Sequence, residues 1–269
     1  MAKLVRKEPG VAKRSPLAEK VQEVKDRIAA ACGKAKRDPS EVTLIAVTKT
    51  AAPEQIREIL QLGIGDLGES RVQVLQQRAV QVNEFFARQQ QHGSGEGLPA
   101  RLRWHMIGHL QRNKIKPILP LVSLIHSVDS LRLAEELDVQ AQKLGRRLPI
   151  LMQINASEEP QKSGVAVGAA VHLAEQIDSM PHLQILGLMT LAELDATEQA
   201  IQRTFARTRE VFEEMKFNKI GGAALRHLSM GMSNDFEAAI LEGAKMVRIG
   251  TLLFGGKVTD EGDGSDEAM

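Results

Sequence analysis

The sequence of 269 residues has no tyrosine, one tryptophan, one cysteine and no apolar run near the roughly 20 residues that a membrane helix needs. Its single cysteine, Cys32, cannot form a disulfide within the chain, which is typical of proteins in a reducing compartment. The basic first residues lack the apolar core of an export signal. A net charge of +1 and few aromatic residues argue against a nucleic-acid-binding surface. We therefore expect a cytoplasmic protein that binds a small molecule, with no nucleic-acid or membrane partner.

Short apolar runs alternate with amphipathic segments along the chain. The first run, residues 41–49 (EVTLIAVTK), precedes a helical segment that starts at Pro53 and ends at Gly63. Further strands are predicted at residues 64–69, 103–110, 121–128, 149–155, 183–190, 224–231 and 244–251, and further helices at 70–87, 111–118, 130–145, 167–178, 197–216 and 235–243. The runs do not alternate polar and apolar residues, which indicates a parallel sheet covered on both faces.

Eight such units predict an α/β fold with a single (β/α)8 barrel of the TIM type. An open doubly wound sheet is the alternative, but no GxGxxG follows the first strand to indicate a dinucleotide site. The segment 17–36 has the periodicity of an amphipathic helix. Since little chain follows the eighth strand, we expect this N-terminal helix to complete the ring of helices.

The composition also predicts the boundaries of the domain. Residues 1–15 are basic and are expected to form a flexible arm, residues 16–257 the barrel, and residues 258–269 an acidic, disordered tail. The polar, glycine-rich residues 88–99 are expected to form a disordered loop within the barrel.

Lys49 ends the first apolar run. Ligands of parallel barrels bind at the carboxyl ends of the strands, so Lys49 is expected at the mouth of the barrel. An amine in that place can condense with an aldehyde. The alternative is a lysine that extends from the strand end into water with no further role.

Two glycine-containing segments follow the seventh and eighth predicted strands, where TIM barrels commonly bind phosphate. In residues 229–235 (SMGMSND), Gly231 follows a strand and Ser233 begins a helix, where free N–H groups suit a phosphate. Residues 248–251 (RIGT) offer a cation, a glycine and a hydroxyl. Either glycine could also serve only as a turn. A phosphate site beside an aldehyde-reactive lysine indicates pyridoxal 5′-phosphate, which has both groups.

The motifs LIAVTK, GESRVQ, WHMIGHLQRNK, IHSVDS, KSG, GLMT, LSMGMSND and VRIGTLLFG occur, in this order, within residues 17–256. In this the sequence resembles the pyridoxal phosphate homeostasis proteins, whose barrel is similar to that of alanine racemase. The resemblance implies a fold-type III barrel with the cofactor bound as a Schiff base to Lys49. The cofactor contacts expected from these motifs are Met189, Ser229, Gly231, Met232, Ser233, Arg248, Gly250 and Thr251.

The resemblance also implies a role in intracellular pyridoxal phosphate homeostasis without efficient turnover. It makes amino acids and pyridoxal phosphate-dependent enzymes candidate partners. Two positions depart from the family pattern: Ser70 stands where many members have Asn, and Val74 where many have Glu. The shorter Ser70 has less reach toward a cofactor.

Other polar residues leave two interpretations open. Asn155 either hydrogen-bonds the bound ring or caps the following loop. Lys162 is either a surface lysine or a second place where free cofactor docks. His105 and His109 are four residues apart, but no carboxylate pattern accompanies them, so no metal site is predicted.

The alternative function is a pyridoxal phosphate-dependent amino-acid racemase or a related enzyme. A racemase needs two acid/base groups, one on each face of the cofactor. In alanine racemases the second group is a tyrosine from a separate β domain, and this sequence has no tyrosine. The sequence therefore favours a cofactor-binding protein, and no residue is assigned a catalytic role.

Overall fold

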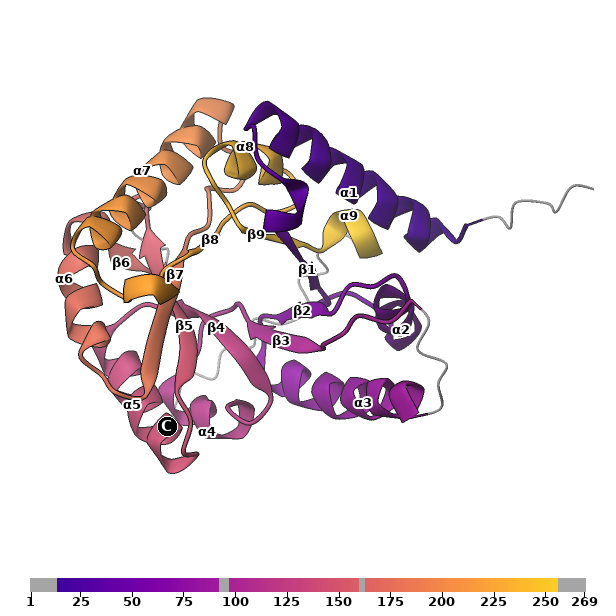
Figure 1. Ribbon diagram of the computed structural model, residues 1–269, viewed down its shortest axis with the longest axis horizontal. Helices are drawn as coiled ribbons and strands as arrows, with labels where there is room; N and C mark the ends of the chain where they lie inside the picture. Colours follow the sequence, from indigo (N-terminus) through magenta and orange to yellow (C-terminus); the bar gives the residue numbers. More distant parts are fainter. Residues whose placement is uncertain (1–13, 92–96, 160–162, 256–269) are drawn as a thin grey trace, which may run out of the picture.

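The computed structural model describes residues 14–91, 97–159 and 163–255. Eight parallel strands close into a barrel, with β9 pairing with β1 and β4 with β5 (Figure 1). They are β1 (Thr43–Val47), β2 (Asp66–Glu69), β3 (Arg103–Met106), β4 (Val122–Val128), β5 (Leu148–Asn155), β7 (Leu183–Met189), β8 (His227–Ser229) and β9 (Met246–Ile249). A two-residue strand, β6 (Val165–Ala166), pairs only with the end of β5. The prediction of a single (β/α)8 barrel is confirmed.

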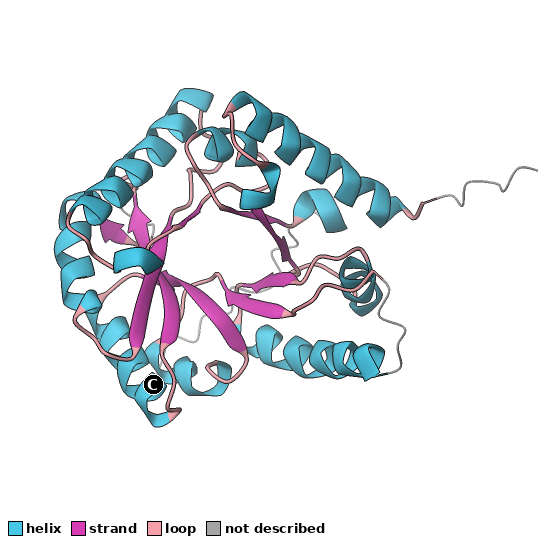
Figure 2. Cartoon of the chain, viewed as in Figure 1, coloured by secondary structure: helices cyan, strands magenta, loops and turns pink. Residues whose placement is uncertain are grey.

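Helices surround the strands (Figure 2). They are α1 (Pro16–Lys34), α2 (Pro53–Gln61), α3 (Val72–Gln91), α4 (Ile115–Ile118), α5 (Leu131–Lys143), α6 (Val167–Asp178), α7 (Glu198–Phe217), α8 (Phe236–Leu241) and α9 (Thr251–Phe254), with 3-10 turns at Pro39–Glu41, Arg112–Lys114 and Gly222–Ala224. Ser15 caps α1, its hydroxyl accepting from the Ala18 N–H at 3.0 Å. Helix α1 packs against α8, α9 and α2, so it completes the ring as predicted.

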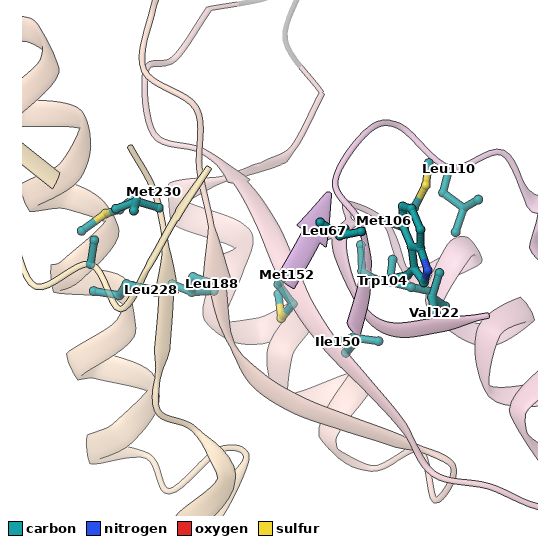
Figure 3. Packing of buried hydrophobic residues seen from close by; sticks show 14 of the residues in the cluster. Leu67, Trp104, Met106, Leu110, Val122, Ile150, Met152, Leu188, Leu228 and Met230 are labelled. Atoms are coloured by element: carbon teal, nitrogen blue, oxygen red, sulfur yellow. The ribbon is translucent and has the colours of Figure 1, made fainter. Parts of the chain in front are cut away.

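The core has two layers because side chains of a strand alternate between the barrel interior and the helices. The larger layer lies between strands and helices, and Figure 3 shows part of it, including Trp104, Met106 and Met152. The smaller layer lies inside the barrel and consists of Ile45, Leu124, Leu151, Met189 and Met246. Burial of both apolar layers is the main stabilisation of the fold.

Some boundaries differ from the prediction. Helix α3 continues to Gln91, into the segment expected to be a loop, because arginine and glutamine favour helices. The eighth barrel strand ends at Ile249, and Thr251 begins the short helix α9, because the backbone leaves the extended region at Gly250. Residues 1–13, 92–96 and 256–269, which include most of the expected arm and the tail, lie outside the described residues. None of the helices in the described ranges is long and apolar enough to span a membrane.

Candidate functional site

Lys49 lies exposed in the turn that follows β1. The residue before it, Thr48, is fully buried and its hydroxyl donates to the carboxylate of Glu69 at the end of β2. From α3, the Arg78 guanidinium donates to the backbone oxygen of Thr48, to Glu69 Oε1 at 2.6 Å and to the backbone oxygen of Ala51 at 3.1 Å. The turn is therefore held on both sides of Lys49, which limits the positions that its side chain can reach.

The two predicted phosphate-binding segments lie on the neighbouring strands. Strand β9 pairs directly with β1, with Ala46 opposite Ile249, so Gly250 follows beside Val47. Strand β8 pairs with the other edge of β9. The structure thus brings together the carboxyl ends of three adjacent strands, which carry Lys49, residues 248–251 and residues 229–233.

These segments present backbone donors that form no hydrogen bond with the described residues. They are the N–H groups of Ser233, Asn234 and Thr251. The Asp235 carboxylate accepts from the N–H of Met232, and the Ser233 hydroxyl accepts from the N–H of Leu252 at 3.4 Å. The first bond closes the loop after β8, and the second joins that loop to the start of α9. The arrangement can hold an anion with several N–H and O–H donors.

Gly231 allows the first of these loops to fold as it does. Its φ is +92°, and a Cβ atom there would lie 2.7 Å from the Cβ of Ala239 and 2.8 Å from the Cα of Phe236. A side chain is therefore opposed both by the left-handed backbone and by the start of α8.

We expect Gly231→Ala to destabilise the fold by about 2–5 kcal/mol, from about 1–2 kcal/mol of backbone strain and about 1–3 kcal/mol of crowding. Gly145→Ala is the matched control, because Gly145 also has a positive φ, +62°, but no atom lies within 4 Å of the added Cβ. Chemical denaturation of both variants separates the two contributions. Equal losses of unfolding free energy in the two variants would show that crowding of the added Cβ against α8 does not destabilise the fold.

Arg248 lies inside the barrel and is 3% exposed. Its Nη1 donates to Ser229 Oγ at 2.6 Å and to the Ser229 carbonyl at 2.7 Å, and its Nη2 donates to the Thr190 carbonyl at 2.8 Å. Burial lowers the pKa of the guanidinium to about 10, against the opposing effect of the Asp235 carboxylate. The group thus stays charged at neutral pH, as a fixed cation beneath the barrel mouth.

The remaining predicted contacts lie across the mouth. Met189 is fully buried in the interior layer. Asn155 caps the following loop, its Nδ2 donating to the Glu159 carbonyl at 2.7 Å while its Oδ1 accepts from the Ser157 hydroxyl at 3.2 Å. Asn155 also lines a cavity of about 270 Å³ with His109, Gln153, Ser163 and others. Lys162 lies outside the described residues.

His105 and His109 are separated by the structure. His105 is buried in the barrel, whereas His109 is exposed beside Asp129, with 3.4 Å between Nδ1 and Oδ2. The part of the chain that the structure describes holds no cluster of three or more potential metal ligands. Arg78 was not singled out from the sequence, and an arginine in a polar helix carries no local signal of the contacts it makes to the β1 turn.

Comparison with known proteins gives a consistent result. Residues 15–258 match the family model described as the alanine racemase N-terminal domain. The pyridoxal phosphate homeostasis protein of Pseudomonas aeruginosa is 39% identical over 243 residues, which cover 90% of this chain and 96% of that protein. The structure of PipY from Synechococcus elongatus with PLP bound has a TM-score of 0.71 and 34% identity, over 89% of this chain and 100% of PipY.

Alanine racemase itself is more distant. The structure of the Clostridium difficile enzyme has a TM-score of 0.64 at 14% identity, over 90% of this chain and 58% of that one, which shows a shared fold alone. The chain therefore belongs to the family of the pyridoxal phosphate homeostasis proteins, which has the barrel of the alanine racemase N-terminal domain.

Proposed function

We propose that this protein binds pyridoxal 5′-phosphate at the barrel mouth and takes part in its intracellular homeostasis without efficient turnover. The observation that carries the proposal is the juxtaposition of the exposed Lys49, which follows β1, with the unused N–H donors that follow β8 and β9. The PLP-bound structure of PipY, a relative of 34% identity, supports the same ligand.

The residues present fit the chemical groups of this cofactor. Gly231 and Gly250 let the two loops pack closely on α8 and on Val47, and Ser233 and Thr251 bring hydroxyls to the same loops as the free N–H groups, so this cradle would hold the phosphate. When bound, the cofactor supplies an aldehyde that can link covalently to the Lys49 amine. Met232 and Met189 would border the ring, and Ser229 and Arg248 would lie beneath it.

The same site suggests its exchange partners. Lys49 is exposed, so a cofactor attached there would be open to other amines, including amino acids and the lysines of pyridoxal phosphate-dependent enzymes. We propose these as partners, and a cytoplasmic location, in keeping with the buried free thiol of Cys32.

The test is the site of covalent attachment. The purified protein is titrated with pyridoxal phosphate, the visible absorption spectrum is recorded, the complex is reduced with borohydride, and the modified peptide is identified by mass spectrometry. We expect one cofactor per chain on Lys49. Lys116→Ala, at an exposed lysine of α4, serves as control and should change nothing. Attachment at another lysine, or scattered labelling, would contradict the proposal.

Arg248→Gln should weaken retention of pyridoxal phosphate, because it removes the fixed cation beneath the mouth. Charge-assisted hydrogen bonds contribute about 1.5–3 kcal/mol, which corresponds to a roughly ten- to a hundred-fold increase in the dissociation constant. Titration of the variant with pyridoxal phosphate measures this dissociation constant. Arg226→Gln, at an exposed arginine before β8, is the control for loss of one positive charge. Equal constants for both variants would assign Arg248 to the fold alone.

A further inference from the structure

A continuous chain of polar side chains crosses the barrel interior. At the amino ends of β2 and β3, Arg103 donates to both carboxylate oxygens of Asp66 at 2.6 Å. His105 Nε2 lies 2.9 Å from Asp66 Oδ1, and His105 Nδ1 lies 2.9 Å from His126 Nε2. His126 Nδ1 lies 2.9 Å from Ser229 Oγ, which accepts from Arg248 at the carboxyl end of the barrel.

The two ends of this chain fix the direction of every hydrogen bond in it. A guanidinium can only donate and an ionised carboxylate can only accept, whereas a hydroxyl and a neutral imidazole can each do both. Among the described residues the Ser229 hydroxyl proton has no acceptor other than His126 Nδ1, so Nδ1 accepts it and His126 carries its own proton on Nε2. That proton is donated to His105 Nδ1, and His105 donates from Nε2 to Asp66. All groups are satisfied only if both histidines are neutral and in the Nε2–H form.

The electrostatics agree with this assignment. Burial, the largest effect, and the positive charge of Arg248 hold the pKa of His126 well below its usual range. Burial opposes ionisation of Asp66, but the hydrogen bonds from His105 and Arg103 and the charge of Arg103 outweigh it and lower the pKa of the carboxyl. A neutral imidazole beside an ionised carboxylate is the state that the hydrogen bonds require.

Stability alone gives little reason for such a chain. Buried ionic and polar networks can often be replaced by apolar residues of similar volume without loss of stability. The interior already has an apolar layer of Ile45, Leu124 and Leu151, which could extend further. What the polar chain achieves is a single orientation of Ser229 and, through it, of Arg248, two of whose five donors are not committed to the described residues.

We propose that Asp66, His105 and His126 are positioning residues that hold Ser229 and Arg248 in one orientation beneath the barrel mouth. The consequence for binding rests on the proposed function, because it assumes that pyridoxal phosphate occupies that mouth. The hydrogen-bond directions do not rest on it, and can be measured in the protein without cofactor.

The first measurement is a long-range proton–nitrogen NMR correlation of the ¹⁵N-labelled protein, which reports the tautomer of each histidine. We expect the neutral Nε2–H form for both His105 and His126. A proton on Nδ1 of either residue, in the neutral ring or in an imidazolium, reverses at least one bond of the chain and overturns the proposal.

The second measurement compares two substitutions at one position. His126→Gln retains a donor and an acceptor, whereas His126→Leu has neither. We expect the Arg248 side-chain N–H resonances to keep their positions in the Gln variant and to shift or broaden in the Leu variant. The dissociation constant for pyridoxal phosphate should rise about tenfold in the Leu variant and stay near the wild-type value in the Gln variant.

Leu124→Ala, at another buried position of the same strand, is the control for general loss of packing. It should lower the melting temperature and leave both the Arg248 resonances and the dissociation constant unchanged. Equal effects of His126→Leu and Leu124→Ala would show a structural role only. If the wild-type protein binds no pyridoxal phosphate, the proposed function fails, while the tautomers and the Arg248 resonances still decide the positioning role.

Discussion

We expect the replacement of Lys49 by alanine to abolish covalent retention of pyridoxal phosphate and to leave the barrel folded. The loss is expected to be complete, because an exposed amine at the carboxyl end of β1 cannot be replaced by the methyl group of alanine or by a hydroxyl nearby. Folding is unaffected, since Lys49 is exposed and makes no hydrogen bond or ion pair with the described residues. The visible absorption band and the borohydride-trapped peptide should both disappear.

The residual binding of this variant is informative. The cradle after β8 and β9 does not depend on Lys49, so reversible binding of the phosphate end should persist at higher cofactor concentrations. Lys49→Arg keeps the positive charge but cannot form the link, and it separates the loss of charge from the loss of the amine. If Lys49→Ala still forms a reducible adduct at one defined lysine, the proposed site is wrong.

The order of the strands could be predicted because each buried parallel strand is a short apolar run bounded by helical periodicity. The covering role of α1 followed from the number of strands, since eight strands need a ring of helices and no covering helix was predicted after the eighth strand. The position of Lys49 beside residues 248–251 followed from the same closure, which pairs the first strand with the last.

The chain of hydrogen-bonded side chains inside the barrel could not be predicted in the same way. His126 and Ser229 are 103 positions apart in the sequence, and their strands, β4 and β8, do not pair with each other. Only closure of the barrel shows that their side chains share the interior. Arg248 was expected near the phosphate. Its burial follows from the alternation of side chains along a strand: Val247 and Ile249 pack toward the helices, so Arg248 points into the barrel. The precise ends of β9 and α3 depended on local backbone choices that composition does not fix.

The cofactor site also could not be proposed from one residue alone. A lysine at a strand end or a glycine after a strand is common, and each has a plain structural explanation. The geometry adds what the sequence lacks, which is unused N–H donors on adjacent loops and a turn held by Glu69 and Arg78. Asn155 illustrates the converse, since its amide is engaged with the Ser157–Glu159 loop.

The second large effect is expected at the other end of the barrel, where Asp66 is 9% exposed and accepts from Arg103 twice and from His105 once. Asp66→Asn keeps the shape of the side chain, but it removes the negative charge and places an NH2 group, which is a donor, where a carboxylate oxygen accepted a hydrogen bond. Loss of one partner of a fully buried ion pair costs about 3–5 kcal/mol. Because the Arg103 side chain is 48% exposed and can rehydrate, we expect a smaller loss, about 2–3 kcal/mol.

The pH dependence tests the origin of this loss. The folded-state pKa of Asp66 is lowered, so the carboxylate contributes stability above its unfolded pKa of about 3.9, and this contribution disappears as the pH falls through the lower folded value. The difference in unfolding free energy between wild type and Asp66→Asn should therefore be full at neutral pH and narrow only below about pH 4. Denaturation at several pH values measures it, with Asp178→Asn, at an exposed position of α6, as a control expected to change stability by less than about 0.5 kcal/mol. A difference that stays constant down to the acid transition would mean that packing of the carboxamide, and not the charge of Asp66, causes the loss.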